Sequence, residues 1–386
     1  MQRTLRQIPH RPILHRITAT ALVIVVLTFL IARGVGTATP LVPRARAADP
    51  APAPALVLGV GDSLMAGVGA SLPDERGEFA LFLALARGRF GPDVRGVDVA
   101  VPGETSGTLL APPPPHPVGA GTPTPVPAPP ATPQIDNAQA ELRRLPAGAG
   151  AIVLLSIGGN DLLGVAGKDA GARETALGVF RANLDTALQR LTADGRTRQL
   201  LVQTIYNPNG GDPALPGSDA NWVERFNGAI RDAAKAHPEV VVIDLASAVR
   251  GNEGALTLAA YGDVHLSNAG HRRAADLLWT ETGADRTPPD VTLLSPDAGN
   301  AARAVLTVRA TVTDDSGPDG VARVALLVDG KEGAELLPRP DLAPGTYLGI
   351  WDGRLTPGPH TVGVRATDRA GNTRDAAVNV TVGAAV

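Results

Sequence analysis

The sequence predicts an α/β domain followed by an all-β domain, and three observations support this. From residue 55 to about residue 283, short apolar runs alternate with amphipathic stretches, a rhythm that predicts a mostly parallel sheet covered by helices on both faces. From Val291 onward, strand-like runs are separated by turn residues. Thr287-Pro288-Pro289 marks the boundary between the two patterns. Two domains are also the usual expectation for a chain of 386 residues.

The first 47 residues form a separate segment that we expect to direct export. Four arginines and no acidic residue precede an uncharged apolar run at 17–32, and Ala45-Arg46-Ala47 offers a small-residue cleavage site, the layout of a secretory signal peptide. The long gap before this site leaves a second possibility, an uncleaved membrane anchor through 17–32. Both alternatives place the rest of the chain outside the cytoplasm, either secreted or anchored to the outer face of the cytoplasmic membrane.

A Pro/Ala linker at 48–54 leads into the α/β domain, predicted at 55–284. We expect its strands at the apolar runs 55–60, 96–101, 151–157, 199–205 and 239–244. We expect its helices near 77–88, 136–145, 173–193, 219–236 and 267–281. Ligands bind beyond the carboxyl ends of the strands in open parallel sheets, so the residues that follow each apolar run are the candidates for a site.

One stretch, 111–134, interrupts this rhythm. It contains Pro112-Pro113-Pro114-Pro115 and seven further prolines. Proline lacks the backbone donor that a helix or a central strand needs, so we predict a surface loop with partial polyproline II structure. A tolerated insertion is the simpler interpretation, and a lid or partner-binding loop is the alternative.

The last region, 289–384, is predicted to be a β-sandwich of about seven strands. Expected strands include 305–312, 321–328, 347–351, 360–366 and 376–382. The region resembles bacterial immunoglobulin-like modules, most clearly at 366–373, although no cysteine pair is present. We expect a spacer or a module that contacts carbohydrate or the cell surface.

Charge and cysteine content exclude several functions. Residues 1–47 hold seven arginines and no acidic residue, so the rest of the chain carries 28 basic and 38 acidic side chains, a net charge of −10. Such an acidic body argues against a nucleic-acid partner. The absence of cysteine excludes disulfides and thiolate chemistry. The acidic turn residues Asp314, Asp315 and Asp329 are of a common type, and we expect neither a metal ion nor a cofactor.

The candidate nucleophile is Ser63, in Gly61-Asp62-Ser63-Leu64 directly after the first apolar run. A serine hydroxyl attacks an ester only when a base takes its proton, and acyl transfer also needs donors for the oxyanion. A serine in this position can instead simply cap the next helix.

Two further blocks could supply the oxyanion donors. Gly103 follows the second apolar run, and Gly158-Gly159-Asn160-Asp161 follows the third. A glycine lets a backbone N–H approach a bound ester closely, and the Asn160 carboxamide can donate as well. Both blocks could also be ordinary turns or caps. Asp161 is expected to order the loop rather than to react.

His265 is the candidate base, in Asp263-Val264-His265 before a helical stretch. His116, His237 and His360 lie in unsuitable segments. His271 is a weaker competitor, which we expect to face solvent on the following helix. A single histidine can also be purely structural.

Ser63, Gly103, Asn160 and His265, in this order and approximate spacing, resemble the four blocks of the GDSL/SGNH hydrolase family. The resemblance covers residues 55 to about 283. It implies a three-layer α/β/α fold with a flavodoxin-like sheet, with Ser63 as nucleophile and His265 as base. It also implies an oxyanion hole made by the N–H groups of Ser63 and Gly103 and the side chain of Asn160.

The chain departs from the family pattern in its catalytic acid. The family acid stands three residues before the histidine, where this chain has Gly262, and Asp263 stands two before it. Residues two apart share a side only in an extended segment. Asp263 is therefore expected to orient His265 if this segment is extended, and a backbone carbonyl would otherwise take that role.

These observations predict an exported serine esterase or lipase that acts on a small-molecule, lipid or polysaccharide ester. A carbohydrate O-deacetylase or an acyltransferase on the same site is the enzymatic alternative. A catalytically dead surface-binding or adhesion protein is the alternative of another class.

Overall fold

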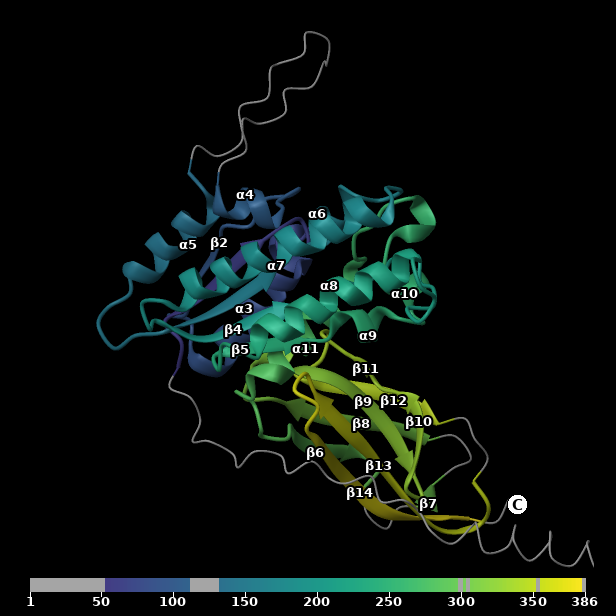
Figure 1. Ribbon diagram of the computed structural model, residues 1–386. Coiled ribbons are helices and arrows are strands. Elements are labelled where there is room, and N and C mark those ends of the chain that lie inside the picture. Colours follow the sequence, from purple (N-terminus) through teal and green to yellow (C-terminus); the bar gives the residue numbers. More distant parts are fainter. Residues whose placement is uncertain (1–52, 112–131, 298–300, 303–305, 352–354, 384–386) are drawn as a thin grey trace, which may run out of the picture. The chain divides into compact units, whose positions relative to one another are not determined.

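The computed structural model describes residues 53–386 except 112–131, 298–300, 303–305, 352–354 and 384–386 (Figure 1). The chain divides into two units, 1–51 and 52–386, and only the second contains described residues. The predicted export segment and most of the proline-rich loop therefore lie outside the described residues. Within the described part of the chain, no helix combines the length and the hydrophobicity needed to cross a membrane.

A five-stranded parallel sheet forms the centre of the first domain. Its strands are β1 (Leu56–Gly61), β2 (Arg95–Asp98), β3 (Ala151–Ser156), β4 (Thr197–Gln203) and β5 (Val240–Ile243). They lie in the order β2-β1-β3-β4-β5 and every neighbouring pair is parallel. This is the flavodoxin-like order that the family resemblance implied.

Five longer helices occupy the predicted stretches: α3 (Glu78–Phe90), α5 (Gln134–Arg143), α7 (Ala170–Thr192), α8 (Asp219–Ala234) and α11 (Asn268–Thr282). Short helical turns join them at strand ends: α2 (Pro73–Arg76), α4 (Ser106–Leu110), α6 (Gly159–Leu163), α9 (Leu245–Val249), α10 (Glu253–Leu256) and the 3₁₀ turn η1 (Ala259–Tyr261). The predicted loop 111–134 ends earlier than expected, because α5 begins at Gln134.

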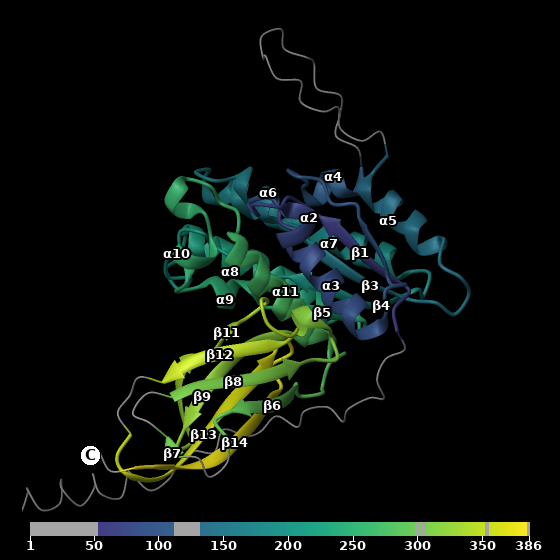
Figure 2. The same ribbon diagram turned by 180° about the vertical axis from the view of Figure 1, so that it is seen from behind.

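Alternating side chains on the central strands build two cores. Leu56, Leu58 and Val60 of β1 pack with side chains of α5, α7 and α8, whereas Val57 packs on the other face with side chains of α3 and α11. Period-two alternation in a strand places neighbours on opposite faces. The result is a three-layer α/β/α domain, which the opposite views in Figures 1 and 2 show.

The second domain is antiparallel except at one short edge strand. One sheet has the order β10-β9-β13-β14-β7 and the other β11-β12-β8-β6. The strands are β6 (Asp290–Ser295), β7 (Ala301–Ala302), β8 (Leu306–Thr313), β9 (Val321–Val328), β10 (Lys331–Glu335), β11 (Leu337–Pro338), β12 (Thr346–Trp351), β13 (Gly358–Asp368) and β14 (Thr373–Val382). Inward-facing residues of both sheets form a shared core, as in an immunoglobulin-like sandwich.

A buried glutamine fixes the end of β1 that leads to Ser63. The side chain of Gln134 accepts a hydrogen bond from the Gly61 N–H at 2.6 Å and donates one to the Gly61 carbonyl at 2.9 Å. Its amide also donates to Glu104 Oε2 at 3.2 Å. Gln134 is 1% exposed, so these partners have no easy replacement by solvent.

We predict that Gln134→Leu lowers the free energy of unfolding by about 1–3 kcal/mol, because it leaves the buried Gly61 N–H unpaired, while the Gly61 carbonyl still accepts from the Val101 N–H. Urea unfolding would measure this. Gln189→Leu, at an exposed position of α7, is the control and should change stability by less than about 0.5 kcal/mol. Equal stability of Gln134→Leu and the wild type would contradict this role.

Candidate active site

Ser63 lies immediately beyond β1 in a turn that requires glycine at its start. Gly61 has φ +129°, and a Cβ there would lie 1.9 Å from the carbonyl oxygen of Ser156. The buried Asp62 side chain then fixes the turn by accepting hydrogen bonds from the Leu64 N–H at 3.1 Å and the Ser156 hydroxyl at 3.0 Å. Burial raises the pKa of Asp62 to about 6. Ser63 itself is only partly buried, so its hydroxyl is accessible.

His265 approaches Ser63 from a non-helical segment between η1 and α11. Its carbonyl accepts a hydrogen bond from the Leu258 N–H, and the next residue, Leu266, is buried and bridges to Thr257. These contacts hold the segment in place. His265 Nε2 lies 2.9 Å from Ser63 Oγ, so the structure brings together two candidates that are 202 positions apart in sequence.

Asp263 lies on the far side of the imidazole. Its Oδ1 is 2.5 Å from His265 Nδ1 and also accepts a hydrogen bond from the His265 N–H at 3.0 Å. The backbone hydrogen bond, followed by the imidazole, lowers the pKa of this carboxyl below its ordinary value. Residues 263 and 264 have no helical structure, so the two side chains share a side even though they are only two positions apart. No backbone carbonyl is needed to take the Nδ1 proton.

The two remaining candidates line the same cavity as Ser63 and His265. Gly103 has φ +86°, and no described atom lies within 4 Å of where its Cβ would stand. Asn160 is in α6, directly after β3, and donates one amide N–H to the Glu104 carbonyl at 2.9 Å. A carboxamide has a second N–H, which leaves Asn160 one donor for a ligand.

Asp161 joins the two oxyanion blocks. Its carboxylate accepts hydrogen bonds from the Ser106 N–H at 2.9 Å and from the Ser106 hydroxyl at 2.5 Å. Ser106 begins α4, three residues after Gly103. Asp161 therefore orders these loops, as expected from the sequence.

The cavity at this site has a volume of about 510 Å³, within the usual range for small-molecule sites. Most of its wall is apolar, contributed by residues of α6, α8 and the segments after β1 and β4. Apolar lining residues are Leu64, Val68, Pro102, Ile157, Leu162, Leu163, Ala166, Ile205, Tyr206, Pro208, Val223 and Val264. Arg173, paired with Asp219 at 2.9 Å, adds a charged group to the wall.

The structure corrects the expectation for His271, which is fully buried rather than solvent-facing. Its Nε2 lies 3.0 Å from the Val68 carbonyl, because the helix face that carries it packs on the loop after Ser63. Of the aromatic residues near the predicted site, Tyr206 lines the cavity and donates to the Val264 carbonyl at 2.8 Å. Trp222 and Phe226 instead belong to the core.

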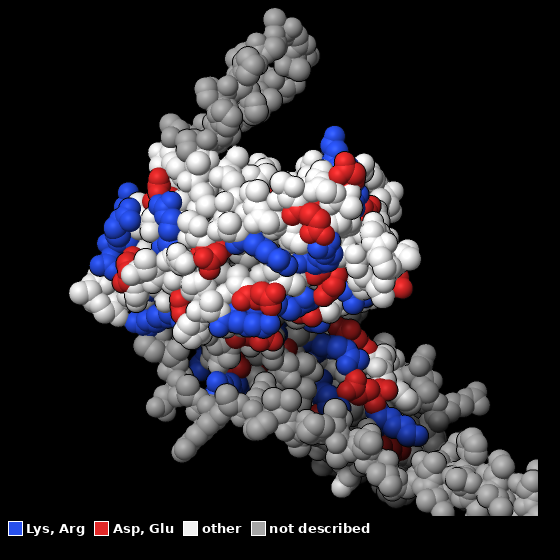
Figure 3. All heavy atoms as spheres, viewed as in Figure 1, with Lys and Arg blue, Asp and Glu red and all other residues white. Residues whose placement is uncertain are grey.

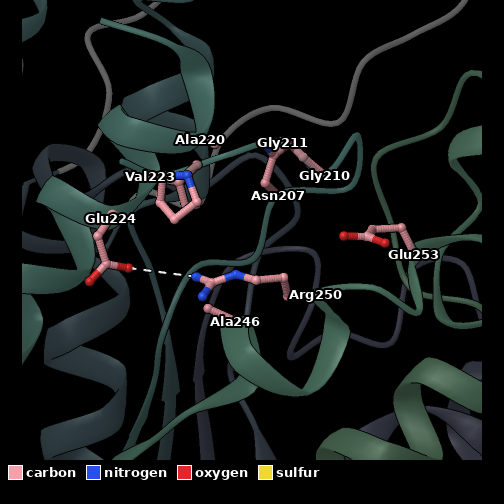
Figure 4. A pocket seen from close by; sticks show the side chains of 10 residues that line it. Asn207, Gly210, Gly211, Ala220, Val223, Glu224, Ala246, Arg250 and Glu253 are labelled. Carbon is pink, nitrogen blue, oxygen red and sulfur yellow. Dashed lines mark hydrogen bonds and ion pairs between the residues drawn. The ribbon is translucent and has the colours of Figure 1, made fainter. Parts of the chain in front are cut away.

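A second hollow near the start of α8 is much smaller (Figure 4). Its volume is about 20 Å³, and Arg250 and Glu224 on its wall form an ion pair at 3.9 Å. This is room for about one water molecule. It is too small for an ester substrate.

Among the described residues, one cluster of three carboxylates has a geometry that could hold a cation. Oxygens of Asp285, Asp314 and Asp368 lie within 4.8 Å of one another. Burial, followed by the charges of the neighbouring carboxyls, raises the pKa of Asp314 to about 6. The three residues do not line the cavity of Ser63, so they take no part in the chemistry there.

Charged side chains of both signs are interspersed over the described part of the face shown in Figure 3, and no continuous basic patch is present among those residues. This distribution differs from the basic footprint with which proteins hold nucleic acid.

Sequence reasoning missed the residues that support the site. Gln134 follows a proline-rich segment, Ser156 lies within an apolar run, and Glu78 begins a helix where an acidic residue is common. None of these positions carries a local signal of burial. Only the alternation of the surrounding apolar residues could have indicated that Ser156 and Glu78 face inward.

The fold and the paired Ser63 and His265 define a class, an ester-hydrolysing enzyme with a flavodoxin-like sheet. The model of the GDSL-like lipase/acylhydrolase family matches residues 60–273, and the chain belongs to this family. A bacterial Ig domain matches residues 289–364. A search of curated proteins found no match.

Solved structures with a similar fold include three from bacteria or microbial communities. A lipase from a goat rumen metagenome is 20% identical, with 60% of this chain and 98% of that one covered and a TM-score of 0.43. An acetylxylan esterase from Geobacillus stearothermophilus is 18% identical, with 61% and 97% covered and a TM-score of 0.40. A lipolytic G-D-S-L protein from Veillonella parvula is 16% identical, with 58% and 96% covered and a TM-score of 0.38.

We predict that Asp263→Asn lowers kcat by about 10²–10⁴-fold, because the amide cannot stabilise an imidazolium and can select the wrong imidazole tautomer. Steady-state hydrolysis of a chromogenic ester would measure this. The control is Asp74→Asn, at an exposed position of α2, which should leave kcat unchanged. A near-normal rate for Asp263→Asn would remove Asp263 from the mechanism.

Proposed function

We propose that this protein is an exported serine ester hydrolase that uses Ser63, His265 and Asp263. The observation that carries the proposal is the 2.9 Å contact between His265 Nε2 and Ser63 Oγ at the wall of an apolar cavity. A nucleophile, a base and a residue that orients the base are the parts that acyl transfer through a serine requires.

The mechanism follows from these contacts. His265 Nε2 takes the proton of the Ser63 hydroxyl as Oγ attacks the ester carbonyl. Asp263 keeps the other imidazole proton on Nδ1 and stabilises the imidazolium. His265 then protonates the leaving alcohol, and a water molecule activated by the same imidazole releases the acid from Ser63.

The oxyanion would rest on the N–H groups of Ser63 and Gly103 and on the free N–H of Asn160. Hydrogen-bond donors that are in place before the reaction stabilise the oxyanion more than donors that must reorganise during it. The bonds of Asn160 to the Glu104 carbonyl and of Asp161 to Ser106 supply this fixation.

The cavity favours an acyl ester with a medium-length apolar chain. A volume of about 510 Å³ exceeds what an acetyl group fills, and an apolar wall stabilises methylene groups by about 0.8 kcal/mol each. Deacetylation of a carbohydrate and acyl transfer to an acceptor would use the same four blocks. An ester panel with and without an acceptor sugar separates these three reactions.

Export is proposed from the sequence of residues 1–47, whose basic start and apolar run are typical of a signal peptide or an N-terminal anchor. On this proposal the enzyme meets lipids, polysaccharide esters or environmental esters outside the cytoplasmic membrane. The immunoglobulin-like domain would then act as a spacer or as a contact to carbohydrate or the cell surface.

We predict that Ser63→Ala abolishes ester hydrolysis, with a loss of at least about 10³-fold in kcat, because no other group can form the acyl-enzyme. The assay is an ester panel from acetyl to dodecanoyl, with circular dichroism as the check on folding. A folded Ser63→Ala protein that retains wild-type activity would refute the assignment of the nucleophile.

We predict that Ala166→Trp shifts the preferred acyl chain to a shorter length, because an indole at this lining position fills part of the cavity. The ratio of kcat/KM for octanoyl and butyryl esters should fall by about tenfold, the effect of one or two lost methylene contacts. Ala182→Trp, at an exposed position of α7, is the matched control. An unchanged ratio in both variants would place the acyl chain elsewhere.

A further inference from the structure

Three buried polar side chains beside the nucleophile loop carry atoms that have no hydrogen-bond partner among the described residues. Glu78 at the start of α3 is 0% exposed, His271 in the first turn of α11 is 0% exposed, and Gln203 at the end of β4 is 2% exposed. Both carboxyl oxygens of Glu78, Nδ1 of His271 and both amide atoms of Gln203 have no partner among the described residues. Nearly all buried polar groups in folded proteins are paired, so this cluster requires an explanation.

The contact of His271 with Val68 sets the protonation of its ring. His271 Nε2 lies 3.0 Å from the Val68 carbonyl, which can only accept a hydrogen bond, so Nε2 carries a proton. Burial lowers the pKa of His271 and favours the neutral imidazole. In a neutral imidazole with the proton on Nε2, Nδ1 is an acceptor. Nδ1 therefore needs a donor.

Glu78 faces this acceptor, with Oε2 3.9 Å from His271 Nδ1. An ionised carboxylate offers only acceptors and would place one acceptor against another. A protonated carboxyl offers an O–H donor on one oxygen and an acceptor on the other. Burial, followed by the negative charges of Asp62 and Asp98, raises the pKa of Glu78 well above its ordinary value, while the Gln203 amide opposes this.

We propose that Glu78 is a positioning residue that works in its neutral form, donating its O–H to His271 Nδ1 and accepting an N–H from the Gln203 amide. These two hydrogen bonds pair four of the five orphaned atoms. The Glu78–His271 contact needs to shorten by about 1 Å to reach hydrogen-bond distance, which a small rotation of the carboxyl provides.

This inference rests on the proposed function, because it assigns Glu78 a role in aligning Ser63 with His265. His271 lies in the first turn of α11, six residues after His265, and bonds to the loop after Ser63 through Val68. Next to this contact, the Asn268 side chain accepts a hydrogen bond from the Ser71 N–H at 2.9 Å and donates one to the Ser71 hydroxyl at 3.1 Å. By holding the ring of His271 in place, Glu78 supports the contact between the loop after Ser63 and the segment that carries His265.

The protonation of Glu78 is tested by stability against pH. The native protein keeps the proton on Glu78, whereas the unfolded chain releases it near pH 4.5. Stability relative to Glu78→Gln must therefore fall as pH rises above about 5, with a folding equilibrium constant about tenfold lower per pH unit for as long as the folded protein keeps the proton. Asp62, Asp98, His271 and Tyr206, the titratable groups that interact with Glu78, are present in both proteins, so the difference between the two proteins reports on Glu78.

The measurement is urea unfolding of the full chain in a Trp351→Phe background, followed by fluorescence. The two remaining tryptophans, Trp222 and Trp279, then both lie in the hydrolase domain. The free energy of unfolding is plotted against pH for the wild type and for Glu78→Gln. If the two curves run parallel from pH 5 to pH 8, the proposal is overturned, because Glu78 would then be ionised in the folded state.

The positioning role is tested by kinetics. Glu78→Gln keeps a donor and an acceptor, so its kcat should stay within about threefold of the wild type. Glu78→Leu leaves Nδ1 of His271 unpaired and should lower kcat by at least about tenfold, with KM within about twofold. Leu188→Ala opens a cavity in the core away from Glu78 and His271. It controls for a general loss of folding stability and should retain the wild-type kcat.

The outcomes separate this inference from the proposed function. If the wild type hydrolyses no ester of the panel, or if Ser63→Ala is as active as the wild type, the proposed function fails. If the wild type is active through Ser63 and Glu78→Leu matches its kcat, only the role of Glu78 fails.

Discussion

The arrangement of this protein depends on a close backbone approach between the loop after β1 and the segment before α11. A Cβ on Gly69 would lie 2.3 Å from the Leu266 carbonyl oxygen and 2.9 Å from Cβ of His265. Only glycine allows this approach, and the approach holds the segment of His265 against the loop that follows Ser63. The flavodoxin-like strand order supplies the frame, since β1 lies between β2 and β3 and places Ser63 at the carboxyl edge of the sheet.

Buried acidic side chains beneath the nucleophile oppose folding at neutral pH. Burial raises the pKa values of Asp62 and Glu78, so each carboxyl costs stability above the pH at which it ionises in the unfolded chain. Apolar residues of similar volume would pack there without this cost. Groups of this kind are common at functional sites. Their position beside Ser63 fits a site in which some folding stability is lost so that the reactive groups are held in place.

Much of the fold and the reactive core of the site could be predicted from the sequence. The alternation of apolar runs and amphipathic stretches gave the five strands and the long helices, because burial on both faces of a parallel sheet imposes that pattern. The blocks around Ser63, Gly103 and Asn160 followed strand ends, and His265 preceded a predicted helix. Asp263 required a conditional argument, since its separation from His265 works only in a non-helical segment.

The supporting residues could not be predicted, for physical reasons. His271 lies on a helix whose polar residues do not reveal which side packs against the loop after Ser63, so it was wrongly assigned to solvent. Gln134 acts on a strand end 73 positions away, and such long-range pairing leaves no trace in local composition. Glu78 resembles an ordinary acidic residue in a first helical turn, although the packing of α3 places it in the interior.

The central claim is that His265 activates Ser63, and the rate of covalent labelling by a fluorophosphonate tests it most directly. The reagent should label the wild type at Ser63, located by peptide mapping, and His265→Ala should react at least about 10²-fold more slowly because the hydroxyl keeps its proton. Equal labelling rates in the two proteins, or labelling at a residue other than Ser63, would contradict the account.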